Sequence, residues 1–357
     1  MNKAASFGDY AILVYPWFCW FQDHVEIRVE EPWVSRDKLG SECNYSKLTF
    51  DGVDRMGERL AGEVLDVVKR WPEVRKISFV AHSLGGLVAR YAIGRLYELF
   101  PKMETAGLSG KCSSREHLNE LTQHPDQHFE ARVAGLEPMN FVTFATPHLG
   151  SRGHRQLPFL CGLPFLERSA PQTAHLFVGR SGKHLFLTDN DEGKRPLLVQ
   201  MVNDSNDVKF MSALRSFKRR VAYANANYDY VVGWRTSSIR RQHELPKSNL
   251  LVKDEKYPHV VYVEQESMEK IHNGTSSMVE KQASDLEEEM VRGLTQVPWE
   301  RVDVSFHETG TFGANKDKVS SSSGPPSQHP IFAEVKSYWL NSDGADVVLH
   351  MIDNFLL

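Results

Sequence analysis

Residues 76–94 read KISFVAHSLGGLVARYAIG, and this stretch decides the fold. It begins with KISFVA, a short run rich in Ile, Phe and Val that is typical of a strand buried on both faces. The pentapeptide AHSLG then predicts a sharp turn from strand to helix, because such a turn needs residues without bulk two positions before and after its central serine. A helix is expected from Leu87 to Leu99. The sequence therefore places Ser83 at the tip of a strand-turn-helix unit, where a nucleophile is exposed to substrate.

The elements around this unit predict a mostly parallel α/β sheet. From Asp51 to Trp71, apolar residues recur at three- and four-residue steps, which predicts an amphipathic helix that ends before Pro72. Later strands are expected at Phe141–Ala145, Arg220–Ala224 and Val302–Phe306, and a final helix at Ala345–Leu356. Strands that alternate with helices form a doubly wound sheet with helices on both of its faces.

The chain of 357 residues divides into an atypical N-terminal segment, residues 1–45, and one α/β domain, residues 46–357. Within the domain, residues 313–328 carry four consecutive serines and a Pro pair, so we expect this stretch to be a flexible loop.

Two insertions interrupt the expected sheet. Residues 102–135 are polar and are expected at the surface. Residues 150–210 mix apolar and charged stretches, and we expect them to include a cap or lid over the site. The apolar part of this insertion, Leu157–Leu166, fits packing in the core equally well.

Composition and charge exclude several classes of protein. The chain has 42 Lys plus Arg against 46 Asp plus Glu, a net charge of −4, so no basic field attracts nucleic acid. The most apolar run, Tyr10–Phe21, is shorter than the roughly 20 residues that a transmembrane helix needs, and it contains Pro16. Asp9 precedes this run, which argues against a signal peptide. The four cysteines form no CxxC pair, so we expect neither a disulfide framework nor a zinc cage, and a cytoplasmic location.

A serine nucleophile needs a base and an acid, and the acid is expected after a later strand. Asp229 lies just beyond the expected strand Arg220–Ala224, where a carboxylate can orient an imidazole. Four other carboxylates lie in the middle insertion and follow no clear strand, so we expect them to be surface charges or helix caps. They are Asp189, Asp191, Asp204 and Asp207.

Three histidines follow the last expected strand and are candidates for the base: His307, His329 and His350. We favour His329, because a histidine in a loop can reach back over the sheet, whereas His350 lies inside the final helix. His82 precedes the nucleophile and is expected to support packing rather than act as the base. His82 and His148 are both expected to line the substrate site. We expect no metal and no organic cofactor, because chemistry by such a triad needs neither.

With these residues assembled, the chain resembles the lipase-like putative serine esterases of plants, a family of α/β-hydrolases. The similar segments cover most of the chain from about residue 46 onward and include SKLTFDGVDRMGERLAGEV, KISFVAHSLGGLVARYAIG, NFVTFATPHLGSRG, YDYVVGWRTSSIR and YWLNSDGADVVLHMIDNFL. The resemblance implies Ser83 as nucleophile, Asp229 as acid and a histidine shortly before a lysine-tyrosine-tryptophan stretch. His329 precedes VKSYW and matches that position.

One departure from the family lies at the N-terminus. Proteins of this type open with an apolar strand that ends in a His-Gly pair, and the following loop supplies one backbone donor to the oxyanion. Leu84 supplies the second donor, but no His-Gly pair precedes Ser46. Loss of one such donor lowers turnover by about 10² to 10³. Either the first strands are missing from a misread or alternatively spliced end, or AILVY and VEIRV replace them imperfectly.

Three hypotheses about function follow. The first is a serine hydrolase that cleaves carboxylic esters, with a preference for lipid-like substrates that would involve transient contact with a membrane surface. The second is an α/β-hydrolase scaffold without catalysis that binds a small ligand or a protein. The third is a peptidase or thioesterase that uses the same triad, because this fold supports many acyl-transfer reactions.

Overall fold

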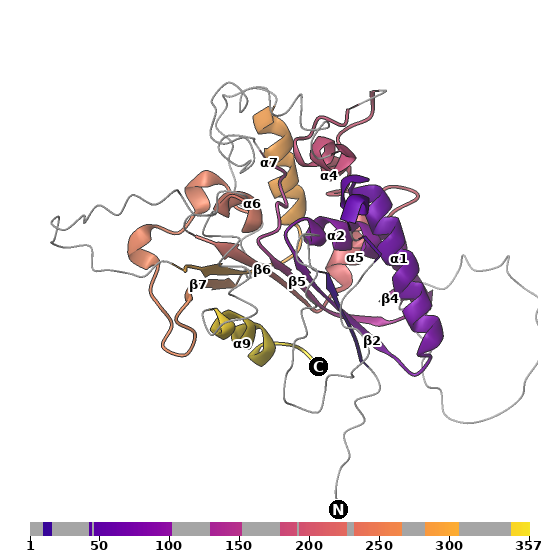
Figure 1. The fold of residues 1–357 in the computed structure, drawn as a ribbon, viewed down its shortest axis with the longest axis horizontal. Coiled ribbons are helices and arrows are strands. Elements are labelled where there is room, and N and C mark those ends of the chain that lie inside the picture. The colour runs from indigo at the N-terminus through magenta and orange to yellow at the C-terminus, as the bar shows by residue number, and fades with distance from the viewer. Residues whose placement is uncertain are drawn as a thin grey trace, which may run out of the picture.

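The centre of the molecule is a six-stranded sheet in the order β1-β2-β5-β6-β8-β7 (Figure 1). In chain order its strands are β1 (Tyr10–Tyr15), β2 (Lys76–His82), β5 (Glu137–Phe144), β6 (Arg219–Asn225), β7 (Val260–Gln265) and β8 (Glu300–Val304). Every neighbouring pair is parallel except β7 with β8. The fold is taken from a computed structural model that describes residues 10–15, 43–44, 46–101, 129–151, 179–190, 193–226, 232–265, 283–306 and 344–357. The parallel order confirms the predicted α/β class.

Helices cover both faces of this sheet. The larger core joins one face to α1 (Val53–Arg70), α2 (Leu84–Leu96), α5 (Phe210–Ser216) and α7 (Ala283–Leu294). The smaller core joins the other face to α9 (Ala345–Asp353), which lies below the sheet in Figure 1. Side chains of β2 alternate between the two cores, with Phe79 in the larger and Val80 in the smaller, as expected for a strand buried on both faces.

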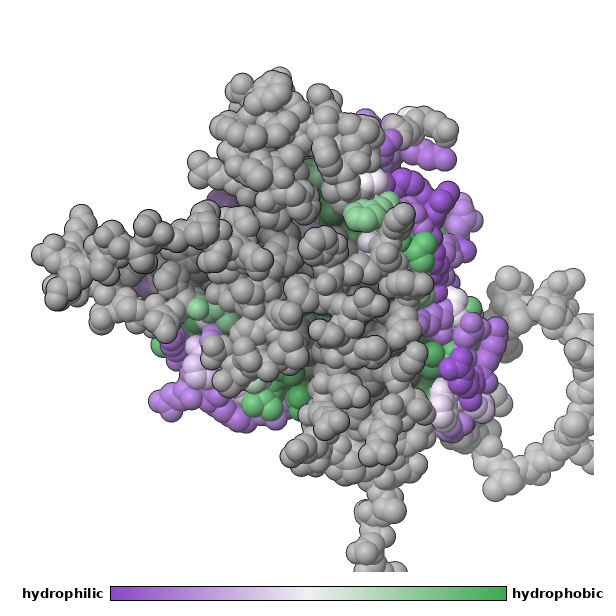
Figure 2. Space-filling view, in the orientation of Figure 1, coloured by the Kyte–Doolittle hydropathy of each residue, from purple (hydrophilic) through white to green (hydrophobic). Residues whose placement is uncertain are grey.

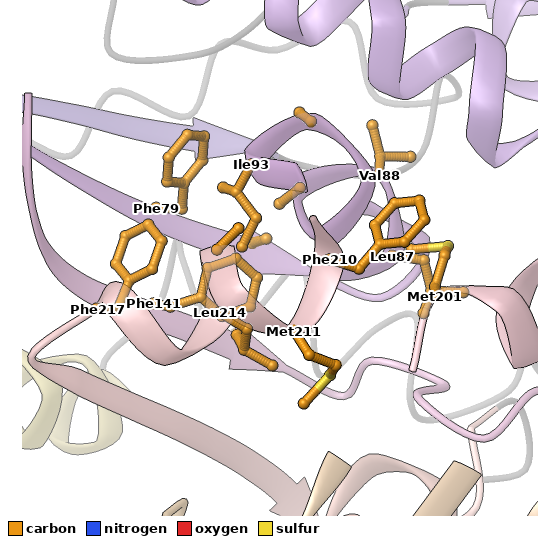
Figure 3. Packing of buried hydrophobic residues seen from close by; sticks show 14 of the residues in the cluster. Phe79, Leu87, Val88, Ile93, Phe141, Met201, Phe210, Met211, Leu214 and Phe217 are labelled. Atoms are coloured by element: carbon orange, nitrogen blue, oxygen red, sulfur yellow. The ribbon is translucent and has the colours of Figure 1, made fainter. Parts of the chain in front are cut away.

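Aromatic rings fill the centre of the larger core. Figure 3 shows Phe79, Phe141 and Phe217 grouped beside Ile93 and Leu214. The Phe217 ring makes edge contacts with the other two, at centroid distances of 6.0 Å from Phe79 and 5.5 Å from Phe141. Rings packed in this way add about 0.5–1.5 kcal/mol per pair beyond the burial of their area. The core therefore holds β2 and β5 rigidly beneath the strand ends.

The predicted amphipathic helix corresponds to α1. Its buried residues include Val53, Met56, Leu60 and Val64, which are members of the predicted apolar stripe. The charged residues of this helix face outward, and the hydrophilic surface at the right of Figure 2 lies over it. The helix prediction between Asp51 and Trp71 is confirmed to within two residues at its start and one residue at its end.

The predicted helix Leu87–Leu99 is misplaced at both ends. The helix α2 begins at Leu84, directly after Ser83. The prediction placed its start later because Gly85 and Gly86 have low helix propensity, but tertiary packing accommodates both glycines in the helix. It ends at Leu96, and the next residues form β3 (Tyr97–Pro101), which pairs antiparallel with β4 (Phe129–Val133). Within the predicted surface excursion 102–135, residues Phe129–Val133 thus form β4, in which Glu130, Ala131 and Arg132 are partly exposed and Val133 is buried.

The N-terminal strand is present. The segment AILVY lies in β1, which pairs parallel with β2, with Tyr10 opposite Lys76 and Tyr15 opposite Ala81. Of the possibilities left open by the sequence, replacement of a missing strand by AILVY fits this arrangement. The segment VEIRV lies outside the described residues.

The remaining predictions of elements hold within a few residues. The strands β5, β6 and β8 match the three predicted strands, and α9 matches the final helix. The antiparallel edge strand β7 was not predicted. The possible lid Leu157–Leu166 and the loop 313–328 lie outside the described residues. Within the described ranges, no helix combines the length and apolar character that crossing a bilayer requires.

Candidate active site

Ser83 occupies a strained turn between β2 and α2. Its φ of 52° and ψ of −129° are unusual for a residue with a side chain, and such a conformation costs on the order of 1–3 kcal/mol. Two backbone hydrogen bonds hold it, from Ser83 N to Phe144 O at 2.8 Å and from Gly86 N to Ser83 O at 3.1 Å. Strain of this kind is typical of a strand-to-helix elbow that presents a serine hydroxyl at the top of a sheet. The turn predicted from AHSLG is therefore present, but Ser83 is buried, with a relative exposure of 4%, so the expected exposure of this residue is wrong.

The first turn of α2 lies against the chain that follows β5. A methyl group at Gly86 would lie 2.6 Å from Thr146 Cγ2 and closer still to Thr146 Oγ1, so a side chain is excluded there. Leu84 is the first residue of α2, and amides in the first turn of a helix have no acceptor within it. The positive end of the helix dipole lies at the same place. These features are those that an oxyanion needs, and Leu84 stays the predicted donor.

Two more backbone hydrogen bonds join the ends of neighbouring strands, one between β5 and β6 and one between β6 and β8. Ala145 N donates to Tyr223 O at 2.9 Å, and Ala226 N donates to Val304 O at 2.9 Å. Ala145 itself has a φ of 45°, so strain occurs at two adjacent strand ends. Together with the bond from Ser83 to Phe144, these contacts fix the carboxyl edge of β2, β5, β6 and β8 as one unit.

His148 is fully buried under this edge. Its Nε2 lies 3.1 Å from Thr143 Oγ1, and its ring makes an edge contact with Trp299 at 5.3 Å. Burial, assisted by the positive charge of Arg90, lowers the pKa of His148 well below its usual value, so the ring is neutral near pH 7. Nδ1 has no hydrogen-bond partner within the described part of the chain. The structure places His148 beside the site, and its contact with substrate stays a prediction.

His82 is the last residue of β2 and directly precedes Ser83. Burial lowers the pKa of His82 to about 4, so this imidazole is also neutral near pH 7. A neutral, desolvated ring fits the predicted packing role, and a role in lining the substrate site stays a prediction.

Of the three candidates for the base, only His350 lies within the described residues. It is buried in α9, where its Nδ1 lies 2.8 Å from Tyr223 Oη and its ring meets the edge of Tyr257 at 4.9 Å. The structure thus packs His350 into the smaller core. His307 and His329 lie outside the described residues, as does Asp229, so the assignment of base and acid stays a prediction.

The competing carboxylates are placed largely as expected. Asp204 accepts hydrogen bonds from the backbone amides of Met211 and Ser212, at 2.8 and 3.1 Å, and so caps α5. Asp189 accepts from Leu197 N at 2.8 Å, at the start of the short helix α4 (Leu197–Gln200). Asp207 is exposed, and Asp191 lies outside the described residues. The predictions of helix cap and surface charge are confirmed for the three that can be placed.

Sequence reasoning did not predict a buried ion pair between β8 and the chain that follows β6. Asp303 of β8 and Arg240 are both buried, and Arg240 Nη1 donates to both carboxylate oxygens at 2.9 and 2.8 Å. Trp234 Nε1 also donates to Asp303, at 2.7 Å, at the start of the short helix α6 (Trp234–Ser237). The only signal is an aspartate within the apolar strand sequence ERVDV. The pair anchors the chain shortly after Asp229.

The helix α6 is also tied to the turn after β5. Thr236 Oγ1 accepts a hydrogen bond from Leu149 N and donates one to Gly150 O, both at 2.9 Å. This residue therefore bridges the segment after the predicted acid and the segment that carries His148. The described residues hold no group of three His, Cys, Asp or Glu side chains that could bind a metal.

Comparison with known families and proteins gives a consistent result. The family described as Putative serine esterase (DUF676) matches residues 32–239. A protein of Schizosaccharomyces pombe named Putative lipase is 31% identical over 217 residues, which are 59% of this chain and 22% of that protein. A protein of Saccharomyces cerevisiae with the same kind of name is 30% identical over 200 residues, which are 56% of this chain and 22% of that protein.

The chain thus aligns with less than a quarter of the length of either yeast protein. No solved structure matches it.

Proposed function

Because this chain belongs to the putative serine esterase family DUF676, we propose that it is a serine hydrolase that cleaves carboxylic esters, with Ser83 as the nucleophile. The observation that carries the proposal is the strained backbone of Ser83 at the junction of β2 and α2. A fold stores such strain where the surrounding structure enforces it, and here two hydrogen bonds and a glycine contact do so.

The proposed reaction proceeds through an acyl-enzyme. Ser83 Oγ attacks the carbonyl carbon while His329 accepts its proton, and Asp229 holds the imidazole in the required orientation. The backbone amide of Leu84 stabilises the oxyanion of the tetrahedral intermediate. His329 then protonates the leaving alcohol, and water attacks the acyl-enzyme with His329 as the base. The products are a carboxylic acid and an alcohol, and Ser83 recovers its proton.

Lipid-like esters are the proposed substrate class. Support comes from the names of the yeast relatives and from the apolar residues Leu157–Leu166 of the sequence. With such substrates, transient contact with a membrane surface is expected. The proposed location is cytoplasmic, from the separate cysteines, and membership of the plant lipase-like group rests on the motifs quoted above.

A second candidate function is a scaffold without catalysis that binds a ligand. The observation in its favour is that β1 ends at Tyr15 and Pro16 follows, where the family has a His-Gly pair. Proline has no backbone N–H, so it cannot donate to an oxyanion.

The test is the intact mass of the purified protein after treatment with a fluorophosphonate, with Ser83→Ala as the control. The hydrolase predicts one adduct on the wild type and none on the control. If the folded wild type gains no mass, the scaffold is favoured and ligand binding becomes the next measurement. With labelling established, an ester panel that includes thioesters and peptides separates an esterase from a thioesterase or a peptidase.

Two histidine variants then test the assignment of the base. His329→Gln is expected to slow labelling by at least about 10²-fold, because a positioned base contributes that much. His350→Gln is expected to label at nearly the wild-type rate, because His350 is packed against Tyr223 in the smaller core. The opposite result would make His350 the base.

A further inference from the structure

Arg90 is a buried arginine of α2 that follows Ser83 in the chain by two helical turns. Its relative exposure is 3%. Both of its terminal nitrogens donate to backbone carbonyl oxygens, Nη1 to His148 O at 3.4 Å and Nη2 to Met201 O at 3.1 Å. The proposed mechanism does not use this residue, so the burial of its charge needs a separate explanation.

The positive charge of Arg90 has no carboxylate partner within the part of the chain that the structure describes. Arginine is almost never fully buried unless it is paired. Burial lowers the pKa of Arg90 to about 9, so the guanidinium keeps its charge near pH 7. The titratable group that faces it is His148, which is neutral near pH 7. Among the described residues, one positive charge is therefore left without a counter-charge in this part of the interior.

This charge lies close to the predicted oxyanion site. Arg90 follows Leu84 by six residues, which is about 9 Å along a helix at 1.5 Å per residue. Helical side chains lean back toward the N-terminus of their helix. The contact with His148 O agrees with this direction, because His148 follows the carboxyl end of β5. The guanidinium therefore lies within about 10 Å of the Leu84 amide.

We propose that the uncompensated charge of Arg90 stabilises the oxyanion that forms when Ser83 attacks a substrate carbonyl. The inference rests on the proposed function and adds a source of stabilisation to the Leu84 amide. Negative charge develops on the carbonyl oxygen only as the bond to Ser83 Oγ forms, so the neutral bound ester gains nothing from the field. At about 10 Å and an effective dielectric constant of about 20, Coulomb's law gives about a tenfold effect on the rate.

The matched control is Arg220 of β6. It is also buried, at 8% exposure, and its side chain donates to carbonyl oxygens, from Nε to Pro298 O at 2.8 Å and from Nη1 to Leu214 O at 3.3 Å. Arg220 is the second residue of β6 and lies about 17 Å from the carboxyl end of that strand at about 3.3 Å per residue. A change to glutamine removes a buried charge and its carbonyl contacts at either place, but only Arg90 is near Ser83.

Arg90→Gln and Arg220→Gln are compared in three quantities: kcat and KM for p-nitrophenyl butyrate, and the midpoint of thermal unfolding. Arg90→Gln is expected to lower kcat about tenfold and to leave KM within about twofold, because the field acts on the transition state and not on the bound ester. Arg220→Gln is expected to leave kcat unchanged even where it lowers the unfolding midpoint as much. The rate constant of fluorophosphonate labelling replaces kcat if the wild type does not hydrolyse this ester.

Equal kcat values in Arg90→Gln and Arg220→Gln overturn the inference and leave the proposed function intact. So does a loss in Arg90→Gln that lies in KM alone, because a charge that acts on the oxyanion does not change binding of the neutral ester. A wild type that neither hydrolyses the ester nor reacts with the fluorophosphonate defeats the proposed function itself.

Arg90→Lys separates the charge from the hydrogen bonds and decides the question if Arg90→Gln does not fold. Lysine keeps a positive charge but has a single nitrogen for two carbonyl oxygens. Burial lowers the pKa of a lysine, so this variant loses its charge at a lower pH than the wild type. The ratio of its kcat to the wild-type kcat is expected to be near one at about pH 6 and to fall about tenfold by about pH 8.5. A ratio that does not change with pH overturns the proposal.

Discussion

Thr146 fills the space that a side chain at Gly86 would need. A methyl carbon added to Gly86 would lie 2.6 Å from Thr146 Cγ2, a distance that packed atoms do not tolerate. The close approach joins the first turn of α2 to the residue that follows the strained Ala145. The first turn of α2 and the chain that follows β5 therefore pack closely against each other beside Ser83.

This close packing predicts that Gly86→Ala destabilises the fold by about 1–3 kcal/mol, the usual range for overpacking of a core. Thr146→Ala should recover part of that loss when combined with it, because it removes the two nearest atoms. The free energy of unfolding in urea, measured for both single variants and the double variant, gives the coupling between the two positions. Additive effects would show that the clash is relieved elsewhere.

The buried pair of Arg240 and Asp303 makes a second prediction. Asp303→Asn leaves the buried guanidinium of Arg240 with Glu264 as its remaining carboxylate partner and is expected to cost about 1–3 kcal/mol. The exposed pair of Arg195 and Glu289 is the matched control, and Glu289→Gln is expected to cost less than about 1 kcal/mol. Urea unfolding measures both. Similar losses of unfolding free energy in the two variants would show that burial of the ion pair does not determine the cost of removing its carboxylate.

The response of stability to pH is a third prediction. Burial lowers the pKa of His82 to about 4 and that of His148 well below its usual value of 6.5. Between those values the unfolded chain binds protons that the folded chain does not, so stability is full above about pH 6.5 and falls as the pH is lowered. Each such histidine contributes a slope of up to about 1.4 kcal/mol per pH unit.

The measurement is the free energy of unfolding in urea at about pH 7 and about pH 5. His82→Gln is expected to reduce the difference between the two, because its side chain does not titrate in this range. If the unfolding free energies at the two pH values differ by as much in His82→Gln as in the wild type, the pH dependence of stability comes from other histidines.

Sequence predicts the parts of this fold that depend on local pattern. The run KISFVA and the apolar stripe of α1 show local patterns that are typical of a buried strand and of a helix. The small residues of AHSLG indicate a tight turn with no room for larger side chains. The start of α2 was placed too late, because Gly85 and Gly86 are poor helix formers, and the contact that requires a glycine at position 86, with Thr146, is not visible in the sequence.

Pairings between distant segments are what the pattern does not reveal. The strand β3 exists because β4 pairs with it across residues 102–128, and β7 exists because it pairs antiparallel with β8. The same limit holds near the site. Nothing local marks Asp303 as the partner of Arg240, or His259 as the partner of Asp346. These contacts join segments 63 and 87 residues apart in sequence.

The hydrogen bonds beyond the strand ends have a consequence for how the site is made during synthesis. Ser83 is held by Phe144, Ala145 by Tyr223, and Ala226 by Val304, so each bond waits for a later segment of the chain. Contacts between distant segments form only after the chain between them has been ordered, which makes them slow. A nascent chain that has not yet released Phe144 therefore carries the sequence AHSLG without the hydrogen bond that holds Ser83 N. The carboxyl edge of the sheet is complete only when β8 has emerged and docked, so the predicted nucleophile acquires its full surroundings late in synthesis.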